Sequence, residues 1–388
     1  MAWNLFRRRR HGLGVNPLLG VIYHWIGGLA SASNFIPFRP IKRWSFEIYW
    51  IIQGFAAWIV APWVVGYIFI PDIFAILRSA PTATLWHTVF WGAMWGVGGL
   101  TFGLAVRYLG IALGYAIALG FCTAFGTLMP PIFNGQIHGI LRQTGGRVIL
   151  LGVAICVIAI AVNGLAGYSK EKEVSAEERA AIGERDYSFG KGLAVAIFAG
   201  IMSSCFAYGL SAGKGIAQIA RQQLLTHGRS DLWQNLPVLI VVLIGGFVTN
   251  FLWSLILIVR NRSAAQFLGA LEINPEEASP EEPTRDPRAR LTASILASNY
   301  ALASLAGVLW YFQFFFYSMG QTKMGKYDFS SWTLHMASII IFATLWGLFL
   351  HEWRETSRRT KLLMALGLCL LIGSTAVVGW GNYLESLT

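Results

Sequence analysis

A few ionisable side chains stand within long apolar stretches of this sequence. The clearest are His24 and His335, and Asp328 lies shortly before the second histidine. Charged and polar groups inside hydrocarbon are costly, so they face a cavity or one another. Imidazole titrates near neutral pH and can take up and release a proton there. These three residues are our candidates for carrying a proton. Alternatively, each histidine is neutral and donates one hydrogen bond. Asp328 either pairs with one of the histidines or caps the helix that follows it.

A second set of candidates surrounds residues 310–317, where one amide, Gln313, stands among seven aromatic rings. Aromatic faces pack against the C–H faces of a sugar ring, and an amide offers hydroxyl groups both a donor and an acceptor. An unpaired amide facing lipid would be unsatisfied, which predicts that Gln313 points inward. The candidate binding residues are Trp95, Asn250, Trp310, Tyr311, Gln313, Tyr317 and Ser331.

The sequence contains no signature of an enzyme or a metal centre. Neither H-E-x-x-H, nor a phosphate-binding loop, nor G-x-S-x-G occurs, and the seven histidines are dispersed. The cysteines form no close pair, so we interpret them as packing residues; they are Cys122, Cys156, Cys205 and Cys369. We expect no enzymatic activity, no metal and no cofactor.

The composition indicates which solvent surrounds these groups. Of 388 residues, 55% are hydrophobic and only 13% are charged, against roughly 25% charged in soluble domains. So few charges cannot coat a water-soluble surface, which excludes a soluble enzyme. The net charge of +11 comes from short basic clusters between apolar runs, so nucleic-acid binding is not predicted. The expected partner is a lipid bilayer.

Ten apolar stretches have the length that crosses a bilayer as a helix, about 20 residues. Alternation of period two is absent, and only helices then satisfy the backbone. We predict an all-α membrane protein with ten transmembrane helices at 17–36, 47–70, 84–106, 111–133, 147–166, 190–212, 236–259, 291–319, 329–350 and 361–382. The first stretch also imitates a secretory signal peptide after Arg7 to Arg10, but Tyr23, His24 and Trp25 interrupt its apolar core.

The two halves of the chain are predicted to be related. The motif G-A-M-W at 92–95 recurs as G-V-L-W at 307–310. Five spans in each half is an odd number, so the halves enter the membrane from opposite faces as inverted repeats, which favours alternating access. The predicted parts are a basic tail at 1–16, a five-helix repeat at 17–166, a polar loop at 167–189, a second repeat at 190–382 containing a disordered acidic, proline-rich loop at 272–290, and a tail at 383–388.

The basic residues predict an orientation. Of the 30 Lys and Arg, 18 fall on the face opposite the two termini and 12 on the terminal face. The positive-inside bias then places the loops around Lys42, Lys172, Arg260 and Arg358 in the cytoplasm and both termini outside. The basic cluster at 7–10 argues for the reverse orientation.

A set of motifs runs through both halves of the chain. The first half contains His24, P-F at 37–38, Trp50, Trp58, P-W at 62–63, G-A-M-W-G at 92–96, R-Y-L-G at 107–110, G-T-L-M at 126–129 and N-G at 134–135. The second half contains Lys214, Pro237, Asn250, W-Y at 310–311, Q-F-F-F-Y at 313–317, Y-D at 327–328, S-W at 331–332, L-H-M at 334–336 and E-W at 352–353. On these residues the sequence resembles the L-rhamnose–proton symporters of the drug/metabolite transporter superfamily across essentially all ten spans.

The resemblance implies proton-driven uptake of L-rhamnose or a related 6-deoxyhexose across a bacterial inner membrane, with no prosthetic group. One departure bears on the substrate. Where the family pattern in the third span reads G-N-I-N-Y-G, this chain has G-G-L-T-F-G at 98–103, with Gly99, Thr101 and Phe102 in place of three polar residues. The alternatives are a different sugar or a less polar metabolite, a proton-antiport exporter, and a membrane sensor or scaffold that transports nothing.

Overall fold

The computed structural model describes residues 14–173, 188–270 and 290–387. Within these residues the regular secondary structure is helical, and the one β interaction is a bridge between Ala270 and Arg290. The predicted all-α fold class is therefore confirmed. Most of the predicted basic tail, and all but the last residue of the predicted acidic loop, lie outside the described residues.

Each predicted span corresponds to a helix in the described chain. These are α2 (Pro17–Ser33), the continuous helix α3 (Phe46–Phe55), η2 (Ala56–Val60) and α4 (Ala61–Phe69), then α6 (Thr82–Leu109), α7 (Ile111–Phe133), α9 (Thr144–Glu173), α11 (Phe189–Ala212), α13 (Leu236–Asn261), α14 (Ala293–Lys323), α15 (Ser331–Phe349) and α16 (Arg358–Ser386). Shorter helices join them: η1 (Ile36–Phe38), α5 (Ile73–Ser79), α8 (Ile137–Arg142), α12 (Lys214–Thr226), η3 (Asp231–Trp233), η4 (Ser263–Leu268) and η5 (Gly325–Ser330).

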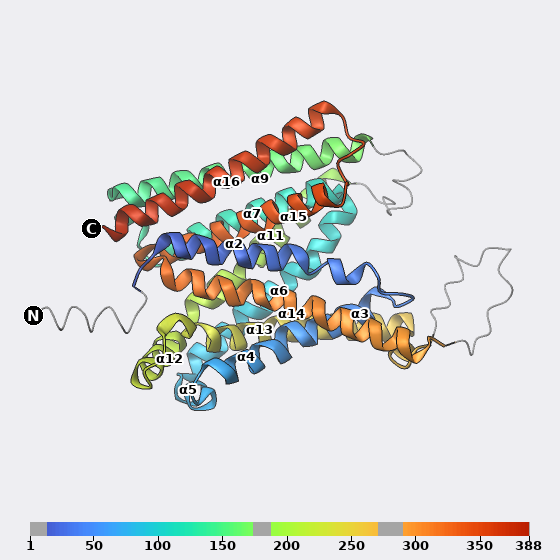
Figure 1. Ribbon diagram of the computed structural model, residues 1–388, viewed down its shortest axis with the longest axis horizontal. Helices are drawn as coiled ribbons and strands as arrows, with labels where there is room; N and C mark the ends of the chain where they lie inside the picture. The colour runs from blue at the N-terminus through green and yellow to red at the C-terminus, as the bar shows by residue number, and fades with distance from the viewer. Residues whose placement is uncertain (1–13, 174–187, 271–289, 388) are drawn as a thin grey trace, which may run out of the picture.

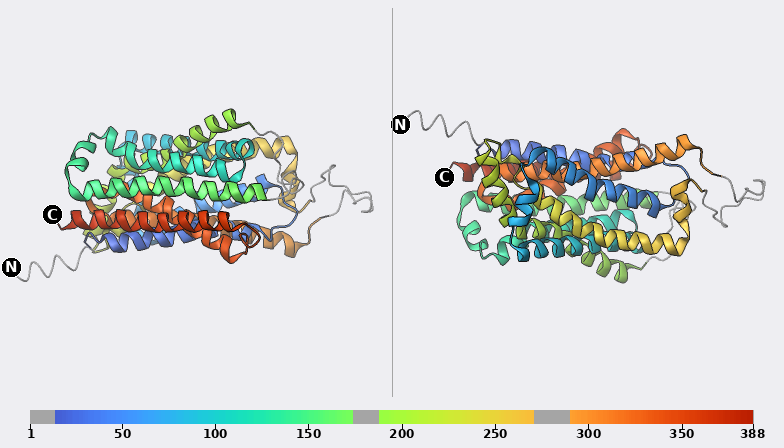
Figure 2. Two further views of the ribbon diagram at one scale, coloured as in Figure 1. Left: turned by 90° about the horizontal axis from the view of Figure 1, so that it is seen from above. Right: turned by 90° about the horizontal axis from the view of Figure 1, so that it is seen from below.

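The long helices run side by side in one bundle (Figures 1 and 2). In the described part of the chain, nine helices are long and apolar enough to cross a membrane. The first helix, α2, has 17 residues, which is about 25 Å at 1.5 Å per residue. The start of α2 and the end of α16 lie at the same end of the bundle (Figure 1). We call this end the terminal face and the other the opposite face.

Local sequence explains several helix boundaries. Pro17 stands in the first turn of α2, where its missing N–H costs nothing, and the Leu19 N–H donates to Asn16 Oδ1 at 3.1 Å. Helices α6 and α7 are separated by Gly110 alone, whose φ of 83° lies in the left-handed region. Glycine adopts this conformation without strain. A single residue therefore reverses the chain between two membrane-length helices.

Two groups of helices pack closely within the bundle. Helix α2 packs against α14 and α15, and α11 packs against α6 and α7, with α13 against α6. We call these the α2 group (α2, α14 and α15) and the α11 group (α6, α7, α11 and α13). Small residues bring the backbones together. A Cβ at Gly27 would lie 2.8 Å from the Gln313 carbonyl oxygen on α14, and one at Gly92 would overlap the Val242 carbonyl oxygen on α13.

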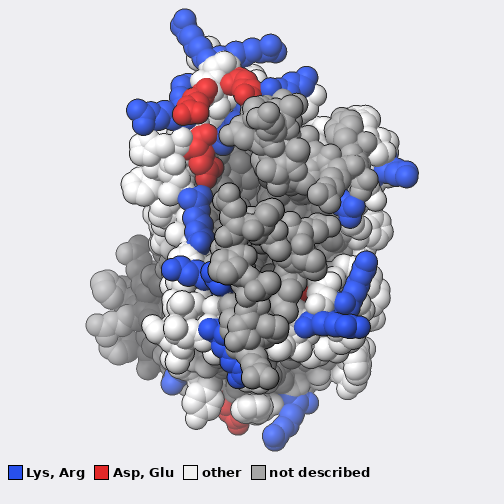
Figure 3. All heavy atoms as spheres, turned by 90° about the vertical axis from the view of Figure 1, so that its right-hand side faces the viewer, with Lys and Arg blue, Asp and Glu red and all other residues white. Residues whose placement is uncertain are grey.

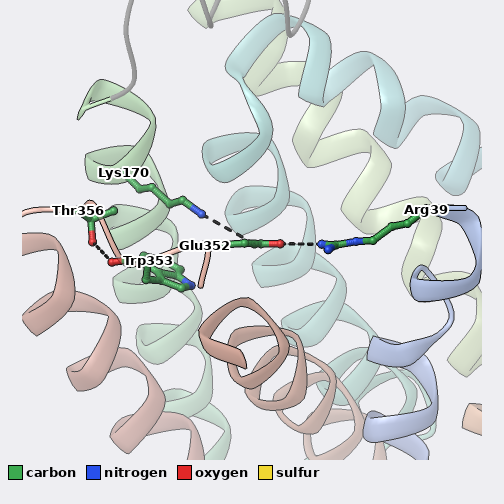
Figure 4. A network of polar contacts seen from close by, with 5 residues as sticks. All are labelled: Arg39, Lys170, Glu352, Trp353 and Thr356. Atoms are coloured by element: carbon green, nitrogen blue, oxygen red, sulfur yellow. Dashed lines mark hydrogen bonds and ion pairs between the residues drawn. The ribbon is translucent and has the colours of Figure 1, made fainter. Parts of the chain in front are cut away.

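Basic residues are spread over the opposite face, with few carboxylates among them (Figure 3). One carboxylate there, on the connection between α15 and α16, joins three segments (Figure 4). Glu352 Oε1 lies 2.8 Å from Arg39 Nη2, and its Oε2 lies 3.9 Å from Lys170 Nζ. The Lys170 ammonium also lies 4.8 Å from the ring centroid of Trp353. Such exposed pairs contribute at most about 1 kcal/mol each, so they align the segments more than they stabilise the fold.

Candidate functional site

A cavity of about 250 Å³ lies near the terminal face, between elements of the two helix groups. We call it the outer vestibule, and its lining includes Lys214, Gln218, Arg221, Gln234, Asn235, Gln321, Thr322 and Asp328. A narrower cavity of about 30 Å³, the inner pocket, adjoins it. Gly126, Pro130, Ala207, Ser211, Tyr317 and Trp332 are among the residues that line the inner pocket. Lys214, Gln321 and Asp328 line both cavities, so the two adjoin, and together we call them the polar path.

An ion pair crosses this path. Lys214 Nζ lies 3.0 Å from Asp328 Oδ2, with the two side chains 54% and 27% exposed. Lys214 begins α12 and is separated from the end of α11 by Gly213 alone, whereas Asp328 belongs to η5 between α14 and α15. The pair therefore links the α11 group to the α2 group. The sequence suggested that Asp328 pairs with a histidine or caps a helix, but in the structure its ion pair is with Lys214.

Tyr317 and Trp332 form the floor of the inner pocket. Both are 2% exposed, and their ring centroids lie 5.9 Å apart. The Trp332 Nε1–H donates to the Cys122 carbonyl oxygen on α7 at 3.0 Å. Gly126, one turn further along α7, makes room for the indole. Trp332 was not among the candidate site residues, although it belongs to the S-W motif and lies three residues before His335.

Two of the three candidate proton carriers, the histidines, lie directly beneath this floor. His24 and His335 are fully buried, and each imidazole centroid lies 5.2 Å from the Tyr317 ring in an edge-on arrangement. Within the described residues, none of their four ring nitrogens has a hydrogen-bond partner. The Ser338 hydroxyl lies within hydrogen-bond distance of both backbone carbonyls, 2.9 Å from that of His24 and 2.8 Å from that of His335. Helices α2, α14 and α15 thus bring together two residues that are far apart in the sequence.

An aromatic cluster continues from the floor into the bundle. Trp95 and Trp310, both predicted, have ring centroids 5.7 Å apart, and Trp58 lies 5.5 Å from Trp310. Phe314 lies 5.1 Å from Trp310 and 6.3 Å from Tyr317, and so connects the cluster to the floor. Trp58 and Phe314 were not predicted as site residues, because aromatic residues in apolar runs are equally common on lipid-facing surfaces.

Gln313 and Ser331 are both buried near this region, at 4% and 0% exposure. The backbone of Gln313 contacts Gly27, which places this turn of α14 against α2. The Ser331 hydroxyl has no hydrogen-bond partner in the described chain. Neither residue lines the vestibule or the inner pocket.

Tyr311 and Asn250 lie apart from the histidines. Tyr311 packs against Phe312 and Phe315; at 100° per residue it lies about 100° around α14 from Trp310 and about 120° from Tyr317. The Asn250 amide is already engaged. It accepts a hydrogen bond from Trp50 Nε1 at 3.4 Å and donates to the Gly246 carbonyl at 2.9 Å. Of the ten candidates, Tyr317 and Asp328 line the cavities described above.

The departures in the third span lie away from these cavities. A Cβ at Gly99 would meet no heavy atom within 4 Å. The Thr101 hydroxyl donates within its own helix, to the Val97 carbonyl at 3.0 Å, and Phe102 packs edge-on against Tyr115 at 4.4 Å. Replacing polar groups at these positions therefore leaves the linings of the vestibule and inner pocket unchanged.

The structure is a bundle of membrane-length helices with a polar path between two packed groups. The path ends at Tyr317, whose ring contacts two buried imidazoles, and this arrangement is typical of a membrane transport protein. The sequence matches the family described as L-rhamnose-proton symport protein over residues 15–270 and 286–383. This protein belongs to the L-rhamnose-proton symport family, which is a family of transporters and not of enzymes.

Curated relatives are similar along nearly their whole length. A protein of Cronobacter sakazakii named L-rhamnose-proton symporter is 32% identical over 364 residues, which cover 94% of this chain and 97% of the relative. Proteins of the same name from Yersinia pestis and Yersinia pseudotuberculosis are each 32% identical over 365 residues, covering 94% of this chain and 98% of the relative.

Proposed function

We propose that this protein takes up L-rhamnose or a related 6-deoxyhexose together with a proton, by alternating access. The observation that carries the proposal is the meeting of the polar path with two buried imidazoles at Tyr317. Membership of the symport family supports the choice of sugar and coupling ion. The position of Gly99, Thr101 and Phe102 away from the cavities supports keeping a sugar as the substrate despite the altered third span.

In this proposal the sugar passes from the vestibule to the aromatic cluster. Tyr317, Trp310 and Trp95 would pack against its C–H faces, and Gln313 would bind its hydroxyls. Ser331 and Tyr311 carry buried hydroxyls without partners in the described chain, which are available to a ligand in another conformation. Asn250 would exchange its present hydrogen bonds for the sugar when the helix groups move.

His335 and His24 would hold the coupling proton, and Asp328 would pass it inward from the vestibule. A ligand shifts a conformational equilibrium only by its different affinities for the two states. Sugar and proton together would therefore favour inward conversion, whereas either alone would favour it less. The Lys214–Asp328 pair is screened by solvent, so breaking it costs little.

We also propose ten membrane spans in two inverted five-helix repeats, as in the drug/metabolite transporter superfamily. The packing of α2 on α14 and α15 is matched by that of α11 on α6 and α7, and α9 packs along α16. This is the pattern expected when first and sixth spans, third and eighth, and fourth and ninth are equivalent. The start of α2 and the end of α16 lie at the same face, which requires an even number of crossings. This supports counting α2 as a span in addition to the nine others, because nine crossings would leave the two termini on opposite faces.

The proposed location is the inner membrane of a bacterium, with the terminal face outside. The support for this orientation is the count of Lys and Arg, of which 18 fall on the opposite face and 12 on the terminal face. The vestibule would then open to the outside, as uptake requires.

Proteoliposomes containing the purified protein provide the test. Addition of L-rhamnose should cause sugar accumulation together with alkalinisation of the external medium, which a pH-sensitive dye records. Uptake of sugar without proton movement would refute the coupling. Vesicles of known orientation with an imposed proton gradient test the direction of transport. Movement of sugar opposite to the proton would show antiport, and the proposed uptake would then be wrong.

A further inference from the structure

Several polar residues line the outer vestibule, and the transport path proposed above assigns them no role. Side-chain amides from three elements meet around it: Gln218 on α12, Gln234 and Asn235 before α13, and Gln321 on α14. The Asn235 Nδ2 group donates to Gln321 Oε1 at 3.2 Å and fixes the orientation of that amide. Within the described residues, no hydrogen bond of the Gln218 side chain or of Gln321 Nε2 is present. Donors and acceptors are therefore left facing the cavity.

The charges around the vestibule are balanced. Lys214 pairs with Asp328 at 3.0 Å, and Arg221 pairs with Asp231 at 3.5 Å. An anionic ligand such as a sugar phosphate would have to displace a carboxylate from one of these cations. An uncharged ligand with many hydroxyls meets no such competition, because each hydroxyl both donates and accepts, as an amide does.

The two cavities differ in whether a ligand fits into them. The vestibule, at about 250 Å³, has room for a small ligand, whereas the inner pocket of about 30 Å³ does not in this conformation. A ligand arriving from the terminal face would therefore rest in the vestibule before the floor at Tyr317 and Trp332 opened.

We infer that the outer vestibule is an entry site for a neutral monosaccharide, bound through the amides of Gln218 and Gln321 before it passes inward. This inference rests on the proposed transport of a sugar and adds a site to it. Gln218 and Gln321 are binding residues in this inference, and neither was predicted from the sequence.

The first experiment measures the initial rate of uptake against L-rhamnose concentration in proteoliposomes. Gln218→Ala and Gln321→Ala should each raise the half-saturating concentration about fivefold to tenfold, the loss expected for one hydrogen bond, with the maximal rate within about twofold of the wild type. Gln222→Ala is the matched control, because Gln222 is exposed on α12 and does not line the vestibule. An unchanged half-saturating concentration in both vestibule variants would overturn the inference.

The second experiment locates the sugar directly. Gln218→Cys and Gln222→Cys, each in a protein lacking the exposed Cys369, are labelled with a membrane-impermeant thiol reagent. Neutral monosaccharides should slow labelling at 218 and leave labelling at 222 unchanged. Equal rates at 218 with and without sugar would contradict a vestibule site.

The two proposals fail in different ways. Uptake of L-rhamnose with unaffected vestibule variants and no protection at 218 would remove the entry site and keep the transport function. Protection at 218 by another neutral sugar, without L-rhamnose uptake, would keep the entry site and remove the proposed substrate. Protection by a sugar phosphate alone would overturn the neutral class of ligand.

Discussion

Replacing Gly126 with alanine is expected to displace the Trp332 indole from the floor of the inner pocket. A Cβ at this position would overlap the Nε1 and Cδ1 atoms of the indole. The same Nε1–H donates to the Cys122 carbonyl oxygen at 3.0 Å. The indole centroid also lies 5.9 Å from that of Tyr317 and 6.1 Å from that of His335. Its displacement should therefore disturb the path between the vestibule and the buried imidazole.

The expected cost combines three effects. Forcing an extra methyl group into a packed contact costs about 1–3 kcal/mol. Losing the indole hydrogen bond costs about 0.5–1.5 kcal/mol. Alanine is a better helix former than glycine, which returns up to about 1 kcal/mol. The net destabilisation should be about 2 kcal/mol, accompanied by a loss of sugar uptake.

Thermal unfolding of the detergent-purified protein, together with uptake in proteoliposomes, measures both effects. Gly120→Ala is the control, because Gly120 lies on the same helix and a Cβ there would meet no heavy atom within 4 Å. This variant should unfold at the wild-type temperature or above it and transport normally. If Gly126→Ala matched Gly120→Ala in both measurements, Trp332 would not depend on the space beside Gly126.

Three further predictions concern coupling, the ion pair and orientation. His335→Ala should abolish accumulation of sugar in proteoliposomes while leaving counterflow exchange partly intact; equal loss of both would assign His335 to binding or structure. Lys214→Gln should change the free energy of unfolding by no more than about 1 kcal/mol, because the Lys214–Asp328 pair is solvent-accessible; a much larger loss in a thermal unfolding assay would make the pair a structural one. A reporter fused after the last residue should give an external signal, and a cytoplasmic signal would reverse the proposed orientation.

Hydropathy predicted the helices well because their length and composition are set by the membrane. The predicted fourth span, 111–133, coincides with α7, since Gly110 ends one helix and starts the next. Helix ends that leave the membrane were harder to predict. Helix α9 continues seven residues beyond its predicted end at 166, and the Ser357 hydroxyl donates to the Glu173 carboxylate there at 2.7 Å. The polar surface helix α12 was not predicted, because no long apolar run marks it.

Residue chemistry predicted part of the candidate site, and helix phase decided the rest. Two histidines at membrane depth had to avoid lipid, and His24 and His335 indeed lie around one tyrosine. Tyr311 and Tyr317 were equivalent as residue types, but only Tyr317 lies on the side of α14 that faces the histidines. The pairing of Asp328 with Lys214 depends on how η5 and α12 approach, and no sequence spacing encodes that contact.

The assembly of the helix groups from distant segments has a consequence for biosynthesis. The α11 group is complete once residue 261 has been made, whereas α2 must wait for α14 and α15 at residues 293–349. In the proposed ten-span arrangement, α2 has to persist in the bilayer as a separate helix during most of translation, which membrane helices can do because their backbone hydrogen bonds are internal. A nascent chain halted after α13 would already contain the part of the vestibule wall that the α11 group and α12 contribute. Its helix α2 would still lack its partners α14 and α15, and His24, which is buried in the complete fold, would face lipid.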